Sequence, residues 1–211
     1  GTEFAARLVR FNGDKIDRLT ISERGTAEAA KSAVEQGRFT VASVETKPLT
    51  RNPPPPFTTS TLQQEASRKL GFSASHTMRV AQNLYEDGAI TYMRTDGVDM
   101  APEAIAGARR AVVERYDAGY VPDKPRVYTT KAKNAQEAHE AIRPTSALRT
   151  PASVAHFLDP DAARLYELIW KRAVACQMVP AILNTVSVDL AAGSEHSFRA
   201  SGTTVIDPGF L

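Results

Sequence analysis

The chain has 211 residues, of which 42% are hydrophobic and 24% charged, a composition typical of one large or two small globular domains. No apolar run is long enough to span a bilayer and no signal peptide opens the chain, so neither a membrane protein nor a secreted one is expected. The formal net charge is only +2, so any affinity for nucleic acid must come from local basic clusters. The single cysteine, Cys176, excludes an internal disulfide and fits a reducing cytosol; its apolar surroundings predict a buried, inert thiol.

The first part of the chain, residues 1–52, has the pattern of β structure with one helix. Partly alternating apolar residues predict strands at 4–11 and 39–45. Between them, alanines at helical spacing predict a helix over residues 26–36.

The middle of the chain, residues 53–180, is predicted to be mainly helical. It opens on four consecutive prolines, which favour a stiff polyproline II connector at a domain boundary. Helical spacing then predicts helices over the following ranges: 59–70, 73–87, 102–116, 136–142 and 161–178. Asp159 and Asp161 have a spacing that can bind magnesium, but directly before a helix they are better explained as its cap.

The last part of the chain returns to β structure, with strands predicted at 183–190 and 198–206. The expected fold class is therefore α+β and multidomain. A helical domain, residues 53–180, is inserted into a discontinuous β-rich domain made of residues 1–52 and 181–211.

Residues 59–93 follow the order helix, tight turn, helix and short β-like run, which is the pattern of a helix-turn-helix with a wing. Thr59-Ser60 is expected to cap the first helix, and Ser73 or Ser75 the second. Basic side chains near the turn, Arg79 among them, are within reach of phosphates. A solvated basic face on a helical hairpin explains the pattern equally well. A winged-helix DNA-binding module without catalytic chemistry is therefore the alternative function.

Tyr92 lies in the short β-like run of residues 89–93. In a strand, Tyr92 and Arg94 point to one face, and Asp96 joins them if the strand continues and is placed to orient Arg94. A phenol with a pKa of about 10 is a poor nucleophile unless it is assisted. A nearby guanidinium favours the phenolate and binds a phosphate through two hydrogen bonds. From composition alone, half-buried packing is the simpler role for such a tyrosine.

The predicted helix at 136–142 carries His139, with Arg143 four residues later on the same face. Two cations on one face suit a phosphodiester, whereas a surface ion-pair lattice with Glu137 and Glu140 is the alternative. Zinc would need a histidine at position 143, where this chain has arginine, so no metal site is expected here.

Taken in order, these stretches resemble the bacterial type IA DNA topoisomerases. The segment from Leu84 to Asp96 is similar to the family's active-site segment, and Phe57 to Ala66 to its helix start. Residues 136–144 are similar to its second signature, and 165–178 continue the match. The resemblance covers about residues 50–180. It implies ATP-independent relaxation of negatively supercoiled DNA through single-strand cleavage, a 5′-phosphotyrosine intermediate and religation.

The resemblance also implies roles for individual residues. Tyr92 matches the nucleophile, Arg94 the residue that positions the scissile phosphate, and His139 a histidine that contacts a neighbouring phosphate. Arg143 matches the arginine of the same motif. The remaining candidate DNA contacts are Thr61, Gln63 and Gln64 at the family's helix start, and Arg79 beside the basic turn.

The family's acidic, metal-binding domain, with a Glu and an Asp-x-Asp after strands, has no counterpart in this sequence. The resemblance therefore implies that Mg²⁺ serves the full-length enzyme from a domain absent here, and that this chain binds none. The expected partners are a single-stranded segment of DNA and the missing N-terminal acidic domain, in the bacterial cytosol or nucleoid. Without that domain the chain is expected to be inactive.

Overall fold

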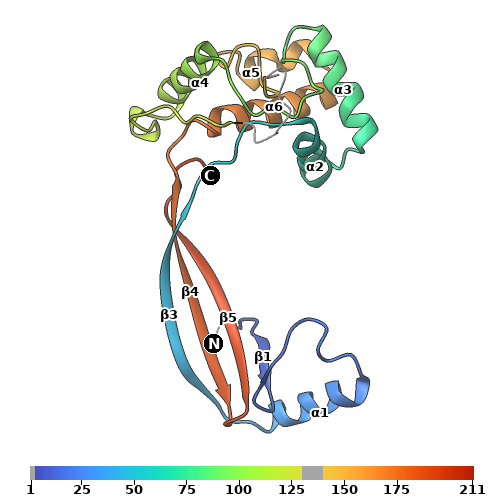
Figure 1. Cartoon of the computed structure of the whole chain (residues 1–211), viewed down its shortest axis with the longest axis vertical. Coiled ribbons are helices and arrows are strands. Elements are labelled where there is room, and N and C mark those ends of the chain that lie inside the picture. Colours follow the sequence, from blue (N-terminus) through green and yellow to red (C-terminus); the bar gives the residue numbers. More distant parts are fainter. Residues whose placement is uncertain (1–2, 130–139) are drawn as a thin grey trace. The chain divides into compact units, whose positions relative to one another are not determined.

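The computed structural model describes residues 3–129 and 140–211 (Figure 1). Packing divides the chain into two compact units. Unit 1 comprises Gly1–Arg51 and Ile182–Pro208, and unit 2 comprises Asn52–Ala181 and Gly209–Leu211. Strands dominate unit 1 and helices dominate unit 2, so the prediction of a mixed helical and β protein is confirmed.

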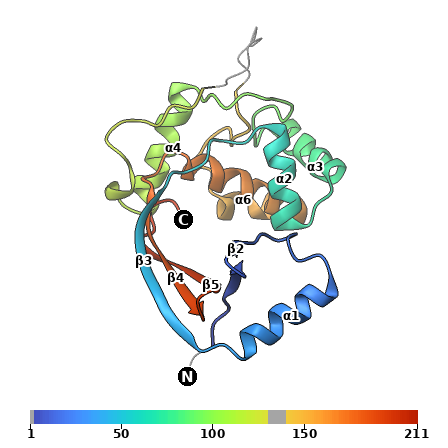
Figure 2. The ribbon, with the colours of Figure 1, turned by 60° about the horizontal axis from the view of Figure 1, so that its bottom comes forward.

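Unit 1 is built on a five-stranded sheet with the strand order β2-β1-β5-β4-β3. Its elements are β1 (Arg7–Phe11), β2 (Asp14–Lys15), α1 (Arg24–Glu35), β3 (Phe39–Arg51), β4 (Ala181–Ala192) and β5 (His196–Asp207). The pairs β1–β2, β1–β5 and β4–β5 are antiparallel. The long strands β3, β4 and β5 curl along their length (Figure 1), and β2, which pairs with β1 at the edge of the sheet, is labelled in Figure 2.

Turn residues and edge position explain the strand lengths in unit 1. Asn12 and Gly13 both have positive φ, 50° and 80°, as a two-residue hairpin between β1 and β2 requires. β3 runs to Arg51, past the predicted end at residue 45. It is an edge strand, where Pro48 can sit without removing a ladder hydrogen bond.

Unit 2 packs its helices around α6, which contacts α2, α3, α4 and α5 (Figure 1). Its elements are α2 (Thr59–Leu70), α3 (Ala74–Glu86), α4 (Pro102–Arg115), η1 (Ala118–Tyr120), α5 (Pro151–Val154), η2 (Ala155–Phe157) and α6 (Pro160–Ala175). Leu165, Tyr166 and Ile169 of α6 are fully buried. Burial of side chains of this size stabilises the fold by about 1.5–3 kcal/mol each. The Tyr166 hydroxyl donates to the Arg149 carbonyl (2.6 Å), so its polar tip is satisfied.

Helix caps follow the sequence signals closely. Asp159 caps α6, as predicted, by accepting from the backbone N–H groups of residues 161 and 162, and Ser73 caps α3. The cap of α2 differs from the prediction. Thr58, rather than Thr59 or Ser60, is the N-cap residue, and it forms a reciprocal capping box with Thr61.

The proline run, residues 53–56, lies at the start of unit 2, directly after the boundary with unit 1, and packs within unit 2. Pro53 and Pro56 are buried. The Tyr128 hydroxyl donates to the Pro53 carbonyl (3.1 Å), and Arg172 Nη1 donates to the Pro55 carbonyl (3.3 Å). Prolines have no backbone N–H to donate, but their carbonyls accept hydrogen bonds. Two carbonyls of the run therefore accept from side chains elsewhere in unit 2.

Candidate active site

Three segments that are distant in sequence meet at the start of α2: residues 57–59, 89–95 and 140–145. Backbone hydrogen bonds of 2.8–3.0 Å join them: Ile142 N to Phe57 O, Thr59 N to Thr95 O, Thr91 N to Arg143 O, and Thr145 N to Ala89 O. Residues 89–95, called the Tyr92 segment below, lie between the other two and are therefore held from both sides.

Two threonine hydroxyls reinforce these contacts. Thr59 Oγ1 donates to the Met93 carbonyl (2.8 Å) and accepts from the Thr95 N–H (2.9 Å). Thr91 Oγ1 donates to the Ala141 carbonyl (2.7 Å). The backbone on both sides of Tyr92 is thus fixed to other parts of unit 2.

Side chains of the Tyr92 segment alternate between solvent and interior. Tyr92 is 45% exposed, and Arg94 and Asp96 are exposed as well. Met93 and Thr95 are 1% and 8% exposed. The buried pair anchors the segment, while the phenol and the guanidinium both face solvent, as the parity argument predicts.

The segment is nevertheless not the predicted strand. Ile90 forms an isolated antiparallel bridge with Pro144, and residues 91–94 belong to no named strand. Proline has no N–H to donate, so the pairing has no ladder hydrogen bond to extend from that residue. The alternation of exposed and buried side chains along the Tyr92 segment therefore comes from hydrogen bonds to two separate segments, residues 57–59 and 140–145, and not from a continuous strand ladder.

The ring of Tyr92 lies against that of Tyr85, with centroids 5.3 Å apart and an interplanar angle of 68°. Within residues 3–129 and 140–211, no hydrogen bond or ion pair engages the Tyr92 hydroxyl or the Arg94 guanidinium. In this part of the chain, Asp96 likewise forms no ion pair with Arg94, so its predicted orienting contact is not seen. Both candidate groups are accessible to a ligand.

The second motif differs from its predicted conformation. Residues 140–144 are extended, because they bridge to Asp99, Phe57 and Ile90 in turn. A helix continuing to Ile142 is therefore wrong. His139 lies outside the described residues, and so does its predicted pairing with Arg143.

Arg143 is mostly buried, with 12% of its side chain exposed, and its guanidinium is already engaged. It donates to Glu140 Oε2 (2.6 Å) and to the Pro144 carbonyl (2.9 Å). Glu140 also accepts from the Ala101 N–H (2.6 Å) before α4. Arg143 thus takes part in the ion pairing that was its alternative role, and it lines a hollow of about 200 Å³ beside the first turns of α4.

The candidates at the start of α2 divide into two kinds. Thr61 is committed to the cap, because its hydroxyl accepts from the Thr58 N–H (2.9 Å). Gln63 is half-buried and Gln64 exposed, and in the described part of the chain neither amide has a hydrogen-bond partner. The two glutamines therefore remain available for contacts, whereas Thr61 is structural.

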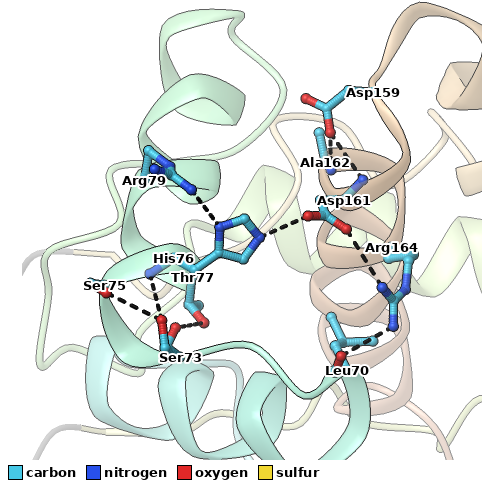
Figure 3. Close-up of polar contacts among 10 residues, drawn as sticks. All are labelled: Leu70, Ser73, Ser75, His76, Thr77, Arg79, Asp159, Asp161, Ala162 and Arg164. Carbon is cyan, nitrogen blue, oxygen red and sulfur yellow. Dashed lines mark hydrogen bonds and ion pairs between the residues drawn. The ribbon is translucent and has the colours of Figure 1, made fainter.

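Arg79 is exposed on α3, and its guanidinium is oriented by a relay (Figure 3). Arg79 Nη2 donates to His76 Nδ1 (2.8 Å), and His76 Nε2 donates to Asp161 Oδ2 of α6 (2.8 Å). A neutral imidazole has one donor and one acceptor nitrogen, so this arrangement requires the proton on Nε2. The His76–Asp161 contact joins α3 to α6, and Arg164 pairs with the same carboxylate from within α6 (3.5 Å).

Three residues that contact the Tyr92 segment, Tyr85, Thr59 and Thr91, are not predicted from the sequence as part of the site. One signal points to Tyr85. Gly88, with φ of 66°, ends α3 and reverses the chain, which brings residue 92 back toward the last turn of the helix. No comparable signal exists for the threonines, because their partners lie more than 30 residues away.

Among residues 3–129 and 140–211, no three histidine, cysteine or acidic side chains come together as a metal site. None of the helices in these ranges combines the length and apolar character needed to cross a membrane.

Known proteins resemble the chain along almost its whole length. The family model described as DNA topoisomerase matches residues 3–211. The chain belongs to the DNA topoisomerase family. It is 60% identical over 209 residues to DNA topoisomerase 1 of Zymomonas mobilis, covering 99% of this chain and 17% of that relative. It is 56% identical over 220 residues to DNA topoisomerase 1 of Xylella fastidiosa, covering 99% and 27%.

A solved topoisomerase structure shares the fold. Full-length topoisomerase I from Thermotoga maritima matches with a TM-score of 0.73 and 34% identity, over 99% of this chain and 36% of that one. The resemblance to topoisomerases is therefore confirmed, and so is a topoisomerase I fold of helices and a curled antiparallel sheet. The chain spans 17% and 27% of the length of the two curated relatives described above.

Proposed function

We propose that this chain is the tyrosine-bearing part of a type IA DNA topoisomerase that relaxes negatively supercoiled DNA without ATP in the bacterial cytosol. One observation carries the proposal. In a chain of the topoisomerase family, Tyr92 and Arg94 are both exposed, while Met93 between them is buried and anchors the segment.

The reaction needs one nucleophile, and it reversibly exchanges a phosphodiester of DNA for a phosphodiester to tyrosine. The Tyr92 oxygen attacks the phosphorus in line, and its proton is lost as the O–P bond forms. The DNA 3′-oxygen leaves and takes up a proton, so one phosphodiester replaces another and no ATP is needed. After strand passage, the 3′-hydroxyl attacks the phosphotyrosine and releases Tyr92.

The chain's cations would bind and orient the phosphates. Arg94 is free to hold the scissile phosphate through two hydrogen bonds and to stabilise its developing charge. His139, from the motif in which it lies, is proposed to contact a phosphate next to the scissile one. Arg143 supports the same motif by holding residues 140–144 in place. The outer DNA contacts are assigned to Gln63, Gln64 and Arg79.

The same proposal covers the domain organisation. Unit 2 is the helical domain, inserted into the discontinuous β-rich domain represented by unit 1. Within it, α2 and α3 form the helix-turn-helix, and the Ile90–Pro144 bridge takes the place of a longer wing. The Mg²⁺-binding acidic domain belongs elsewhere in the full-length enzyme, so the isolated chain should not relax DNA.

Mixing the chain with the separately made acidic domain, Mg²⁺ and a labelled single-stranded oligonucleotide tests the nucleophile. A covalent adduct that mass spectrometry maps to Tyr92 is expected. Tyr92→Phe removes only the hydroxyl, so the adduct should disappear while the oligonucleotide still binds. Tyr116→Phe is the matched control, because Tyr116 is 50% exposed in the same unit and should leave the adduct unchanged.

Three results would count against the proposal. An adduct that persists in Tyr92→Phe would rule out this nucleophile. Oligonucleotide binding without an adduct in any protein would favour the winged-helix binding module. Plasmid relaxation by the chain alone would contradict its expected inactivity.

A further inference from the structure

Tyr85 is the side chain that contacts the Tyr92 ring. It lies in the last turn of α3, is 41% exposed, and meets the ring of Tyr92 at 68° and 5.3 Å. Across the described residues, the Tyr92 hydroxyl makes no hydrogen bond. The orientation of the phenol therefore depends on this ring contact rather than on polar partners.

The backbone of both tyrosines is held firmly. Leu84, next to Tyr85, is fully buried, and its carbonyl accepts from the Ala89 N–H (2.8 Å) just after the helix end. Met93, next to Tyr92, is buried and tied to Thr59. The remaining freedom at the site is rotation of the side chains.

An exposed tyrosine with a fixed backbone still has three staggered χ1 wells. An edge-to-face aromatic pair favours the rotamer that makes it by about 2–10-fold over the others. In-line attack needs the phenol oxygen in one orientation, so loss of this bias lowers the fraction of enzyme ready to react.

We propose that Tyr85 is a positioning residue, whose ring holds the Tyr92 phenol in the orientation for attack on the phosphate. This inference rests on the proposed nucleophilic role of Tyr92. It requires the ring of Tyr85 and not its hydroxyl, which separates it from a direct hydrogen bond to DNA.

The test compares Tyr85→Phe with Tyr85→Leu in the complete enzyme that carries this chain. Single-turnover adduct formation on a single-stranded oligonucleotide gives the rate, and fluorescence anisotropy gives the Kd. Tyr85→Leu should lower the rate about 2–10-fold with an unchanged Kd, because only the rotamer bias is lost. Tyr85→Phe should keep the wild-type rate. Tyr116→Leu, at a similarly exposed tyrosine of unit 2, should change neither.

A second measurement checks the contact without any chemistry. In the isolated chain with ¹³C-labelled tyrosine, the NMR signals of the Tyr92 ring should carry a ring-current shift from Tyr85. Tyr85→Phe should keep this shift and Tyr85→Leu should remove it, while the spectrum of the other tyrosines shows that the fold is intact.

The outcomes separate the two proposals. An unchanged rate in Tyr85→Leu, or a Kd that weakens as much as the rate falls, would overturn the positioning role. Equal loss in Tyr85→Phe and Tyr85→Leu would assign the effect to the hydroxyl and overturn it as well. If the wild-type enzyme forms no adduct although the NMR shift is present, the nucleophilic role of Tyr92 fails first.

Discussion

Thr59 is the residue on which the geometry of the Tyr92 segment depends most directly. Its hydroxyl serves both the Met93 carbonyl and the Thr95 N–H. Thr59→Val keeps the shape but leaves these groups without their partner, and an unsatisfied buried group costs about 1–3 kcal/mol. We expect the free energy of unfolding of unit 2 to fall by about that amount. Urea titration followed by fluorescence of the single tryptophan, Trp170, measures it, since Trp170 is buried in unit 2.

Ser67→Ala is the control for Thr59→Val. Ser67 is exposed on the same helix, and substitutions at such positions change stability by less than about 0.5 kcal/mol. Equal urea midpoints for Thr59→Val and Ser67→Ala would show that the hydroxyl is not needed to hold the segment.

Sequence parity was informative at this scale, but only for neighbouring residues. Alternation along the chain placed Tyr92 and Arg94 on one exposed side, and the structure agrees. Two other features depend on how the chain turns after α3. The ring of Tyr85 lies beside Tyr92, and among the described residues Asp96 does not pair with Arg94. Spacing alone does not contain that information.

Arg172 connects three elements of unit 2. Its guanidinium lies 4.2 Å from the ring centroid of Phe57, 3.7 Å from Glu65 of α2, and donates to the Pro55 carbonyl. Arg172→Lys keeps the charge but loses the planar guanidinium, which stacks on the Phe57 ring and can donate several hydrogen bonds at once. We expect a loss of about 1–2 kcal/mol in the unfolding free energy of unit 2, again measured by Trp170 fluorescence in urea.

The neighbouring Lys171 supplies the control for Arg172→Lys. Lys171 is exposed, and among the residues that the structure describes it pairs only with Glu167 on its own helix. Lys171→Arg should leave stability unchanged within about 0.5 kcal/mol, as expected for a surface pair. A similarly small effect of Arg172→Lys would mean that the proline run is held by other contacts.

Helical periodicity in the sequence predicts the helices that bury one face against α6. It does not predict the segments whose conformation is set by pairing with a distant strand or bridge partner. α4 and α6 lie close to the ranges that helical spacing predicts, and α6 ends at Ala175, three residues before the predicted end. Helical spacing also predicts a helix that continues to Ile142, but bridges to Asp99 and Phe57 hold residues 140–142 extended. Such partners are distant in sequence, and tertiary contacts override local propensity. β3 likewise continues beyond its alternating stretch because β4 lies beside it.

The two units differ in how much apolar surface they bury. Most of the described buried hydrophobic residues belong to unit 2, whereas β3 of unit 1 is exposed along its whole length. The titratable groups with strongly raised pKa values also lie in unit 2. We therefore expect the loss of stability of unit 2 at alkaline pH to be set by the ionisable groups buried within it.

Burial raises the pKa of Cys176, of Tyr128 and of Tyr166 to about 12 each, from ordinary values of 9.0 for the thiol and 10.0 for the phenols. In the unfolded chain these groups lose their protons first. Between about pH 9 and 12 the unfolded state thus binds fewer protons than the folded state, and stability falls as pH rises. The slope approaches about 1.4 kcal/mol per pH unit for each group ionised only in the unfolded state.

Pulse alkylation of Cys176 across a urea series measures this slope, because the buried thiol reacts only when unit 2 unfolds. The midpoint should fall steadily between about pH 9 and 11. Tyr128→Phe should be less stable at pH 8, since the hydroxyl no longer donates to the carbonyls of Pro53 and Cys176. Its midpoint should also fall less steeply with pH, because one ionising group is gone. Equal slopes for the two proteins, or a midpoint that does not move up to pH 11, would show that burial of these groups does not set the alkaline stability of unit 2.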